Sequence, residues 1–142
     1  MESVFSKSWK KSGKAEKQRK YVYNAPYHIR GKLMQSPLSK ELRKKYNKRS
    51  VRVKTGDKVK ILRGQFKGKE GKIESVDLGK YRVYVEKIEL IKKDGTKTPY
   101  PIHPSNVMLT DLDQDDKKRF KRLTQQSKTT KSKEQEGEVK NE

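Results

Sequence analysis

The chain of 142 residues carries 38 Lys and Arg against 18 Asp and Glu, a formal net charge of +20. So large a positive charge on a small chain excludes an ordinary enzyme of this size and favours a polyanionic partner. Leu, Ile, Val and Phe together account for 28 residues, just under the fraction of about one fifth below which highly charged chains tend toward disorder, which excludes a single large core.

The first third of the chain, residues 1–54, holds 17 basic residues against 3 acidic ones and predicts a basic extension with short helices. Pro26 favours the start of one short helix. A stronger start signal follows at Ser36, which we expect to be an N-cap with a proline at the first helical position. Leu38 and Leu42 would share one face of this second helix. An unneutralised extension of this charge would repel itself, so nucleic acid is the expected partner.

The middle of the chain, residues 55–112, contains 16 of the 28 Leu, Ile, Val and Phe residues and is the predicted core. Apolar and polar residues alternate there in short segments separated by glycine-containing turns, a pattern typical of strands. We expect five short strands joined by tight turns, which favours a small barrel. The strand-like pieces are residues 58–61, 73–76, 82–86 and 107–110, and a hairpin made of 88–92 and 96–100 around Asp94-Gly95.

The end of the chain divides into a predicted helix and a predicted tail. Between residues 113 and 122 three aspartates precede five basic residues, the order of charge that a helix dipole favours. We expect a helix over 113–125 with Phe120 and Leu123 facing inward. Residues 126–142 are almost entirely polar or charged and predict a disordered tail.

A glycine-rich basic loop separates the first two predicted strands and carries the clearest functional signal. Its glycines let backbone N–H groups approach a phosphate and tolerate positive φ. Arg63, Lys67 and Lys69 would surround the same place with positive charge, and Phe66 could stack on a base or sugar. This arrangement suits an RNA backbone.

The same loop and its flanking strands resemble the KOW motif, the strand–loop–strand unit of small barrels in ribosomal proteins and transcription elongation factors. The matching positions are Asp57, Val59, Ile61, Gly64, Phe66, Gly68, Gly71 and Ile73. Four further segments resemble the archaeal and eukaryotic branch of the large-subunit ribosomal protein L-twenty-four family, called L-twenty-six in the eukaryotic naming. These segments are Lys17-Gln18-Arg19-Lys20, Asn24-Ala25-Pro26 with His28 and Arg30, Ser36 to Arg43, and Ile102 to Val107.

This resemblance runs from about Lys17 to about Leu123 and implies a mainly β chain with a five-stranded SH3-like (KOW) barrel. It implies a non-enzymatic constituent of the large ribosomal subunit that binds the 5′ region of the rRNA, supports early assembly and lies near the polypeptide exit tunnel of cytoplasmic ribosomes. The implied partners are that rRNA, neighbouring large-subunit proteins and targeting factors at the tunnel exit, with no cofactor. The implied rRNA-binding residues are Gln18, Arg19, Lys20, His28, Arg30, Arg43, Arg63, Gly64, Gln65, Phe66, Lys67, Gly68, Lys69, His103, Ser105 and Asn106.

Several of these residues also have a purely structural interpretation. The loop glycines could be turn or bulge glycines of any small barrel. Phe66 could cap the core instead of touching RNA, and His103 could fix its own loop instead of donating to a phosphate. Three nearby aromatic residues could stack on bases or pack on the barrel: Tyr21, Tyr23 and Tyr27.

Three other functions fit the sequence less well. Transcription elongation factors usually carry an α/β domain before the KOW unit, and residues 1–54 are too polar to form one. A protein bound to an anionic membrane needs a wide apolar helix face, which Leu38 and Leu42 do not supply. An enzyme needs catalytic groups, and neither a nucleophile elbow nor a carboxylate pair suited to acid–base chemistry is visible.

Three further features of the sequence narrow the class of protein. They are its cysteine content, its histidines and its lack of long apolar segments. The sequence has no Cys, which excludes disulfides and thiolate metal sites and fits a reducing compartment. Its two histidines have no carboxylate at metal-ligand spacing, so we expect no metal site. No apolar run approaches the roughly 20 residues that span a bilayer, and residues 1–20 lack a secretory signal. We expect a soluble, intracellular chain of about one domain without membrane insertion.

Overall fold

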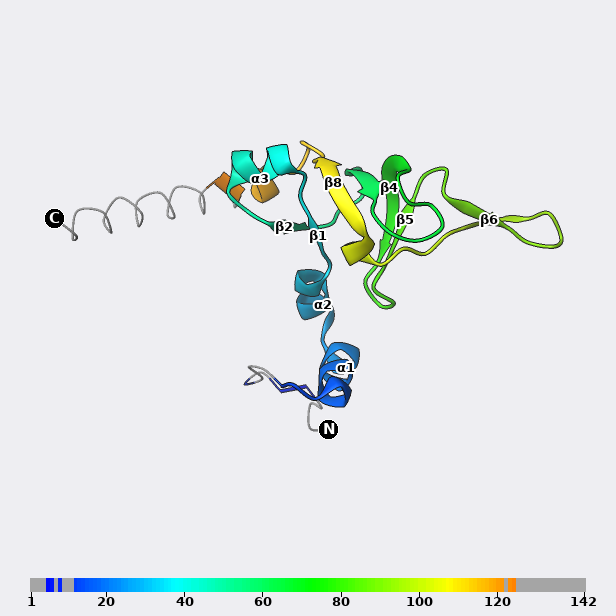
Figure 1. Cartoon of the computed structure of the whole chain (residues 1–142). Helices are drawn as coiled ribbons and strands as arrows, with labels where there is room; N and C mark the ends of the chain where they lie inside the picture. Colours follow the sequence, from blue (N-terminus) through cyan, green and yellow to red (C-terminus); the bar gives the residue numbers. More distant parts are fainter. Residues whose placement is uncertain (1–4, 7, 9–11, 122, 125–142) are drawn as a thin grey trace.

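The computed structural model describes residues 5, 6, 8, 12–121, 123 and 124. The chain is mainly β, with several antiparallel sheets and a few short helices (Figure 1). The predicted tail, 126–142, lies outside the described residues. In chain order the elements are α1 (Ala15–Asn24), α2 (Tyr27–Leu33), β1 (Gln35–Pro37), α3 (Lys40–Tyr46), β2 (Ser50–Arg52), β3 (Lys58–Ile61), β4 (Glu70–Asp77), β5 (Arg82–Val85), β6 (Glu89–Ile91), β7 (Lys97–Pro99), the 3-10 helix η1 (Pro104–Asn106) and β8 (Val107–Asp111).

Two short helices precede the sheets. The predicted start at Pro26 is confirmed, because its carbonyl accepts the N–H groups of Ile29 and Arg30 at 2.9 and 3.0 Å and α2 begins at the next residue. The sequence does not predict α1. This helix buries none of its residues, and the side chain before it makes no capping hydrogen bond, so neither apolar spacing nor a cap marks it in the sequence.

The predicted helix start at Ser36 is wrong by three residues. Ser36 lies in β1, opposite Val51 of β2, and its buried Oγ donates to the Pro104 carbonyl at 2.6 Å. The helix α3 begins instead after Ser39, whose Oγ accepts the N–H of Leu42 at 3.4 Å. Two Ser-containing start signals stand three residues apart in the sequence, and the tertiary contact of the first one decides between them.

Four of the predicted strands form the antiparallel sheet β5-β4-β3-β8. In β4, residues 70–72 pair with β3, and residues 73–77 pair with β5 across a register shift. The predicted hairpin around Asp94-Gly95 is confirmed as β6 and β7, which pair with each other and project from the body (Figure 1). The hydrogen-bonded strands of the described chain do not close into a barrel.

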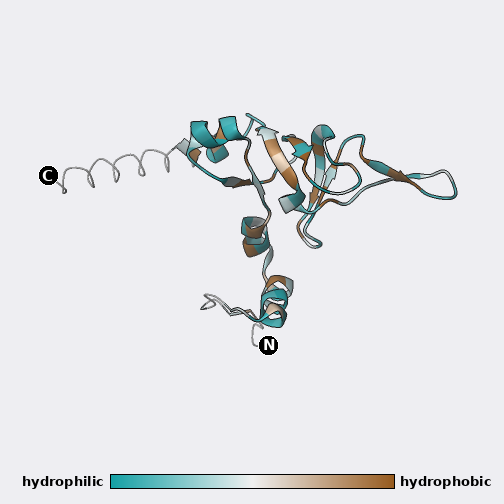
Figure 2. Cartoon of the chain, in the orientation of Figure 1, coloured by the Kyte–Doolittle hydropathy of each residue, from teal (hydrophilic) through white to brown (hydrophobic). Residues whose placement is uncertain are grey.

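The hydrophobic core lies between this sheet and the segment that precedes it. Figure 2 shows hydrophobic residues on the strands and hydrophilic ones over most of α1, α3 and the turns. The sheet contributes Val59, Ile61, Ile73, Val83, Val85, Val107 and Leu109, and residues 34–53 contribute Met34, Leu38, Tyr46, Val51 and Val53 to the same cluster. The boundary between residues 54 and 55, which we predicted from charge, therefore lies within one continuous set of packed side chains.

The helix predicted near the end of the chain is present in residues 117–121, 123 and 124. Asp116 caps it by accepting the Arg119 N–H at 3.0 Å. Leu123 is buried and Phe120 packs partly buried against the core, as predicted. The guanidinium of Arg119 donates to both carboxylate oxygens of Asp57 at 2.6 and 2.8 Å, and this buried pair attaches the helix to the sheet.

Candidate nucleic-acid interface

The loop between β3 and β4 has a defined backbone conformation. The Gly68 N–H donates to the Ile61 carbonyl at 2.8 Å, and the Ile61 N–H donates to the Lys69 carbonyl at 2.9 Å. Gly64 and Gly68 adopt φ of 95° and 87°, which other residues rarely adopt. Both have open space around the position of a Cβ. No side chain therefore covers the backbone at these two positions, although the Gly68 N–H is already used within the loop.

Gly71 has a different role from the two loop glycines. A Cβ at Gly71 would lie 2.7 Å from Val85 Cγ1 and 3.0 Å from the Glu86 carbonyl oxygen, so this glycine lets β4 and β5 pack closely. Gly71→Ala is expected to lower the free energy of unfolding by about 1–3 kcal/mol through overpacking. Gly64→Ala should cost about 1–2 kcal/mol through its positive φ alone.

Urea denaturation of the double variants separates these two causes. Adding Val85→Ala removes the close methyl, so the loss in Gly71→Ala plus Val85→Ala should be smaller than the sum of the single losses. Adding the same change to Gly64→Ala should give additive losses. Additive behaviour in both pairs would show that close packing is not the reason for glycine at position 71.

The loop presents its cations outward and its aromatic residue inward. Arg63, Lys67 and Lys69 are exposed. Phe66 is partly buried against the core, with its ring centroid 5.0 Å from that of Tyr100 in an edge-on arrangement. The Lys69 ammonium lies 5.1 Å from the Phe66 ring centroid, a cation–π distance. Phe66 therefore supports the loop from within and helps hold one of its cations in place.

The second predicted binding segment, residues 103–106, lies beside this loop. The Leu62 N–H donates to the Asn106 carbonyl at 2.8 Å. His103 Nδ1 caps η1 by accepting the Ser105 N–H at 3.3 Å and lies 2.8 Å from Ser105 Oγ. In the neutral imidazole the proton then lies on Nε2, which becomes a hydrogen-bond donor. His103 thus fixes its own loop through one nitrogen and offers the other to a ligand.

The β3–β4 loop and the segment 103–106 together line a cavity of about 340 Å³. Its polar lining comes from Arg63, Gln65, Arg82, His103 and Asn106. Burial lowers the pKa of His103 below its usual value, and the positive charge of Arg82 lowers it further. Both effects favour the neutral imidazole. We call the surface formed by residues 63–69, Arg82, His103, Ser105 and Asn106 the loop face.

Arg82 is a member of the loop face that the sequence reasoning missed. Strand alternation places Val83 and Val85 in the core and Arg82 on the other side of β5. The alternation itself was visible in the sequence. The sequence did not show that Arg82 lies near His103, because this proximity depends on the pairing of β5 with β4 and with Ile102.

The remaining predicted contacts are not on the loop face. Gln18, Arg19 and Lys20 are exposed on α1, and His28 is exposed on α2. Arg43 is exposed on α3, and its Nε donates to the Leu38 carbonyl at 2.7 Å. These positions remain predicted contacts, in separate places on the surface.

Arg30 has contacts within the chain for each of its three guanidinium nitrogens. Nε donates to the Ala25 carbonyl at 2.7 Å, Nη1 donates to the Gly79 carbonyl at 3.0 Å, and Nη2 donates to the Tyr23 carbonyl. These bonds connect α1, α2 and the β4–β5 turn. Arg30 thus positions these three segments, and its contact with rRNA stays a prediction.

Two kinds of site are not found in the described part of the chain. No group of three or more His, Asp or Glu residues there could hold a metal ion. None of the helices described is long and apolar enough to cross a membrane.

Comparisons with known proteins agree on one family. The family model that describes the eukaryotic L26 and the archaeal L24 ribosomal proteins matches residues 12–126. The chain is 53% identical over 102 residues to the "Large ribosomal subunit protein uL24" of Korarchaeum cryptofilum (strain OPF8), an alignment that covers 72% of this chain and 78% of that relative.

Proposed function

Because the chain belongs to the archaeal and eukaryotic uL24 family of large-subunit ribosomal proteins, we propose that its loop face binds large-subunit rRNA. As a member of this family the chain is a structural, non-enzymatic constituent of the large ribosomal subunit and takes part in translation in the cytoplasm. The family match also favours the ribosome over the transcription elongation factors that share the KOW motif.

One observation carries the proposed rRNA contact. Two segments about forty residues apart in sequence, each predicted to touch rRNA, line the same cavity and are tied by the bond from Leu62 to Asn106. Exposed Arg63 and half-buried Arg82 line this cavity together with Gly64. Lys67 and Lys69 are exposed on the same loop. Backbone N–H groups, guanidinium groups and the His103 Nε2–H are all donors, the complement of phosphate oxygens and 2′-hydroxyls.

The proposed mechanism is charge neutralisation combined with recognition of shape. Phosphate contacts release counterions, so each contact contributes to the salt dependence of affinity. The defined backbone of the loop fixes where those cations stand, which lowers the entropy cost of ordering them on the RNA.

Neutralising the loop cations tests this proposal. In the variant Arg63→Gln, Lys67→Gln, Lys69→Gln, the slope of log affinity against log salt should become shallower by about 2–3, since each lost contact removes about 0.7–0.9. Filter binding of a large-subunit 5′-domain rRNA transcript over a range of KCl concentrations measures the slope.

A control with the same loss of charge locates the effect. Lys92→Gln, Lys93→Gln, Lys97→Gln removes three exposed lysines from the β6–β7 hairpin, which projects from the body of the molecule (Figure 1). This variant should keep most of the slope. An unchanged slope in the loop variant would rule out the loop face as the principal rRNA contact.

The resemblance supports further proposals about place and partners. We propose that the bound rRNA is the 5′ region, that binding supports early subunit assembly, and that the protein lies near the polypeptide exit tunnel. Neighbouring large-subunit proteins and targeting factors at the tunnel exit are the proposed protein partners.

The five-stranded SH3-like barrel is also a proposal. Its support is the division of β4, whose first half pairs with β3 and whose second half pairs with β5 across a register shift. A strand bent by a bulge in this way is typical of barrel corners. The bridge between Val83 and Ile102 adds chain along the outer edge of β5.

A further inference from the structure

A second cavity lies between α1, α2 and the turn that joins β4 to β5. Its volume is about 450 Å³, within the range of about 300–1,000 Å³ typical of small-molecule sites. Its lining includes Gln18, Arg19, Tyr23, Arg30, Gly79 and Tyr81. None of these residues belongs to the loop face. We call it the α1 cavity.

The walls of the α1 cavity are held in place by contacts within the chain. The three guanidinium nitrogens of Arg30 bond to carbonyls of Ala25, Gly79 and Tyr23, as described above. The Tyr81 hydroxyl donates to the Val22 carbonyl at 3.2 Å. These bonds connect both helices to the β4–β5 turn, so the site is organised before any ligand binds.

The aromatic residues at this site are exposed although they are large. Tyr23 is 79% exposed and Tyr27 is 69% exposed, so neither ring contributes to the core. Tyr23 lines the cavity, and the Arg30 guanidinium carbon lies 5.6 Å from the Tyr27 ring centroid and 5.9 Å from that of Tyr81. Tyr21 differs, because its ring centroid lies 4.9 Å from that of Phe5.

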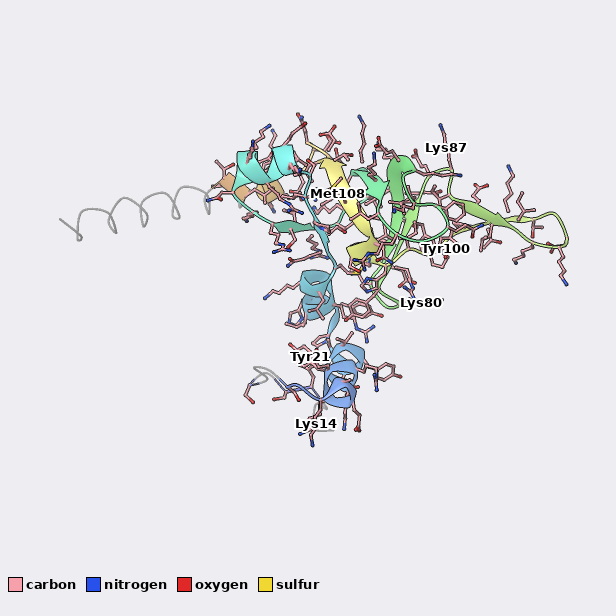
Figure 3. All side chains as sticks on the ribbon, viewed as in Figure 1. Lys14, Tyr21, Lys80, Lys87, Tyr100 and Met108 are labelled. Atoms are coloured by element: carbon pink, nitrogen blue, oxygen red, sulfur yellow. The ribbon has the colours of Figure 1, made fainter. Side chains whose placement is uncertain are left out.

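Positive charge surrounds this aromatic surface. Arg19 lines the cavity and Lys20 follows it on α1. Lys80 lies in the β4–β5 turn and is labelled in Figure 3. No carboxylate is among the lining residues of the cavity. An open aromatic face beside cations is the combination that binds unpaired nucleotides, because every base has a π-face and every nucleotide carries a phosphate.

We propose that the α1 cavity receives one unpaired nucleotide of RNA, with its base stacked on Tyr23 and its phosphate contacted by Arg19. This inference rests on the proposed function and deepens it. The loop face would contact the rRNA backbone, whereas the α1 cavity would require a base that is free of its partner. The protein would then recognise a junction or bulge rather than an uninterrupted helix.

Two probes and two variants of the full chain test the proposal. Fluorescence anisotropy measures binding to a single strand of about ten adenines and to an RNA duplex of about ten base pairs. Tyr23→Leu should weaken single-strand binding at least about fivefold and change duplex binding by less than about twofold. Tyr23→Phe keeps the ring and should bind both probes as the parent does. Because the Tyr23 ring is mostly exposed, both variants should fold.

The outcomes separate this inference from the proposed function. If Tyr23→Leu binds the single strand as tightly as the parent does, the α1 cavity is not a base site. The same conclusion follows if Tyr23→Leu and Tyr23→Phe weaken single-strand binding equally. It follows also if Tyr23→Leu weakens binding to the single strand and to the duplex equally. If the variant Arg63→Gln, Lys67→Gln, Lys69→Gln still loses affinity for the rRNA transcript in that case, the proposal that the loop face binds rRNA stands. If the parent binds neither probe nor rRNA, both proposals fail.

Discussion

Replacing Arg119 with Met is expected to lower the free energy of unfolding by about 3–5 kcal/mol at neutral pH. Asp57 is fully buried, and Arg119 supplies its only charged partner in the described structure, through two hydrogen bonds. The Lys54 and Asp113 N–H groups also donate to the carboxylate, at 3.0 and 3.1 Å. Met fills much of the volume of Arg but leaves a buried negative charge without its cation.

Urea denaturation followed by far-UV circular dichroism measures this loss. Lys121→Met is the matched control, because it removes one positive charge from an exposed position of the same helix and should change stability by about 0.5 kcal/mol or less. Adding Asp57→Asn to Arg119→Met removes the unpaired charge and should recover part of the loss. A loss in Arg119→Met no larger than in Lys121→Met would mean that the pair contributes little to the folded state.

The role of Asp57 shows where sequence reasoning stops. Its match to the KOW motif was visible, but the motif assigns it no physical task. Its partner Arg119 lies on a helix far along the chain, within a run of basic residues that reads as a solvated surface. Only the packing of Leu123 and Phe120 on the core brings that one arginine to the carboxylate.

Local patterns predicted the sheet well because strands have a short period. Val59, Ile61, Val83 and Val85 alternate with polar residues and are all buried. The start of α3 was harder to predict, because Ser36 and Ser39 both satisfy the local rules for an N-cap. Ser36 is removed from that role by its hydrogen bond to Pro104, a contact that no local rule contains.

The candidate interface was predictable in its parts and not in its assembly. The basic loop and the segment around His103 each follow from residue type and family resemblance. The two segments line one cavity together with Arg82 only because of the way the strands pair. The α1 cavity was not predictable, because α1 has no local signal and because the bonds of Arg30 to three carbonyls bridge distant segments.

A chain that begins at residue 55 is expected not to fold, although residues 55–112 hold most of the strands. Residues 34–53 place five apolar side chains in the common core: Met34, Leu38, Tyr46, Val51 and Val53. Burial of such a side chain contributes about 1.5–3 kcal/mol, so losing five removes about 7–15 kcal/mol. Whole domains of this size are stable by only about 5–15 kcal/mol.

The backbone contacts of the missing segment add to this loss. The Ser39 N–H donates to the Leu109 carbonyl at 2.9 Å, and Ser36 Oγ donates to the Pro104 carbonyl. Without residues 34–53, the edge of β8 and the groups around η1 lose these partners.

A chain that begins at residue 34 is the matched control, since of the apolar residues before that point in the described chain only Ala25 is buried. Thermal unfolding followed by circular dichroism should show a cooperative transition for residues 34–142 and none for residues 55–142. A cooperative transition in both chains at similar temperatures would show that the sheet folds alone. The basic extension would then be a separate rRNA-binding arm, as its charge by itself predicts, instead of a part of the core.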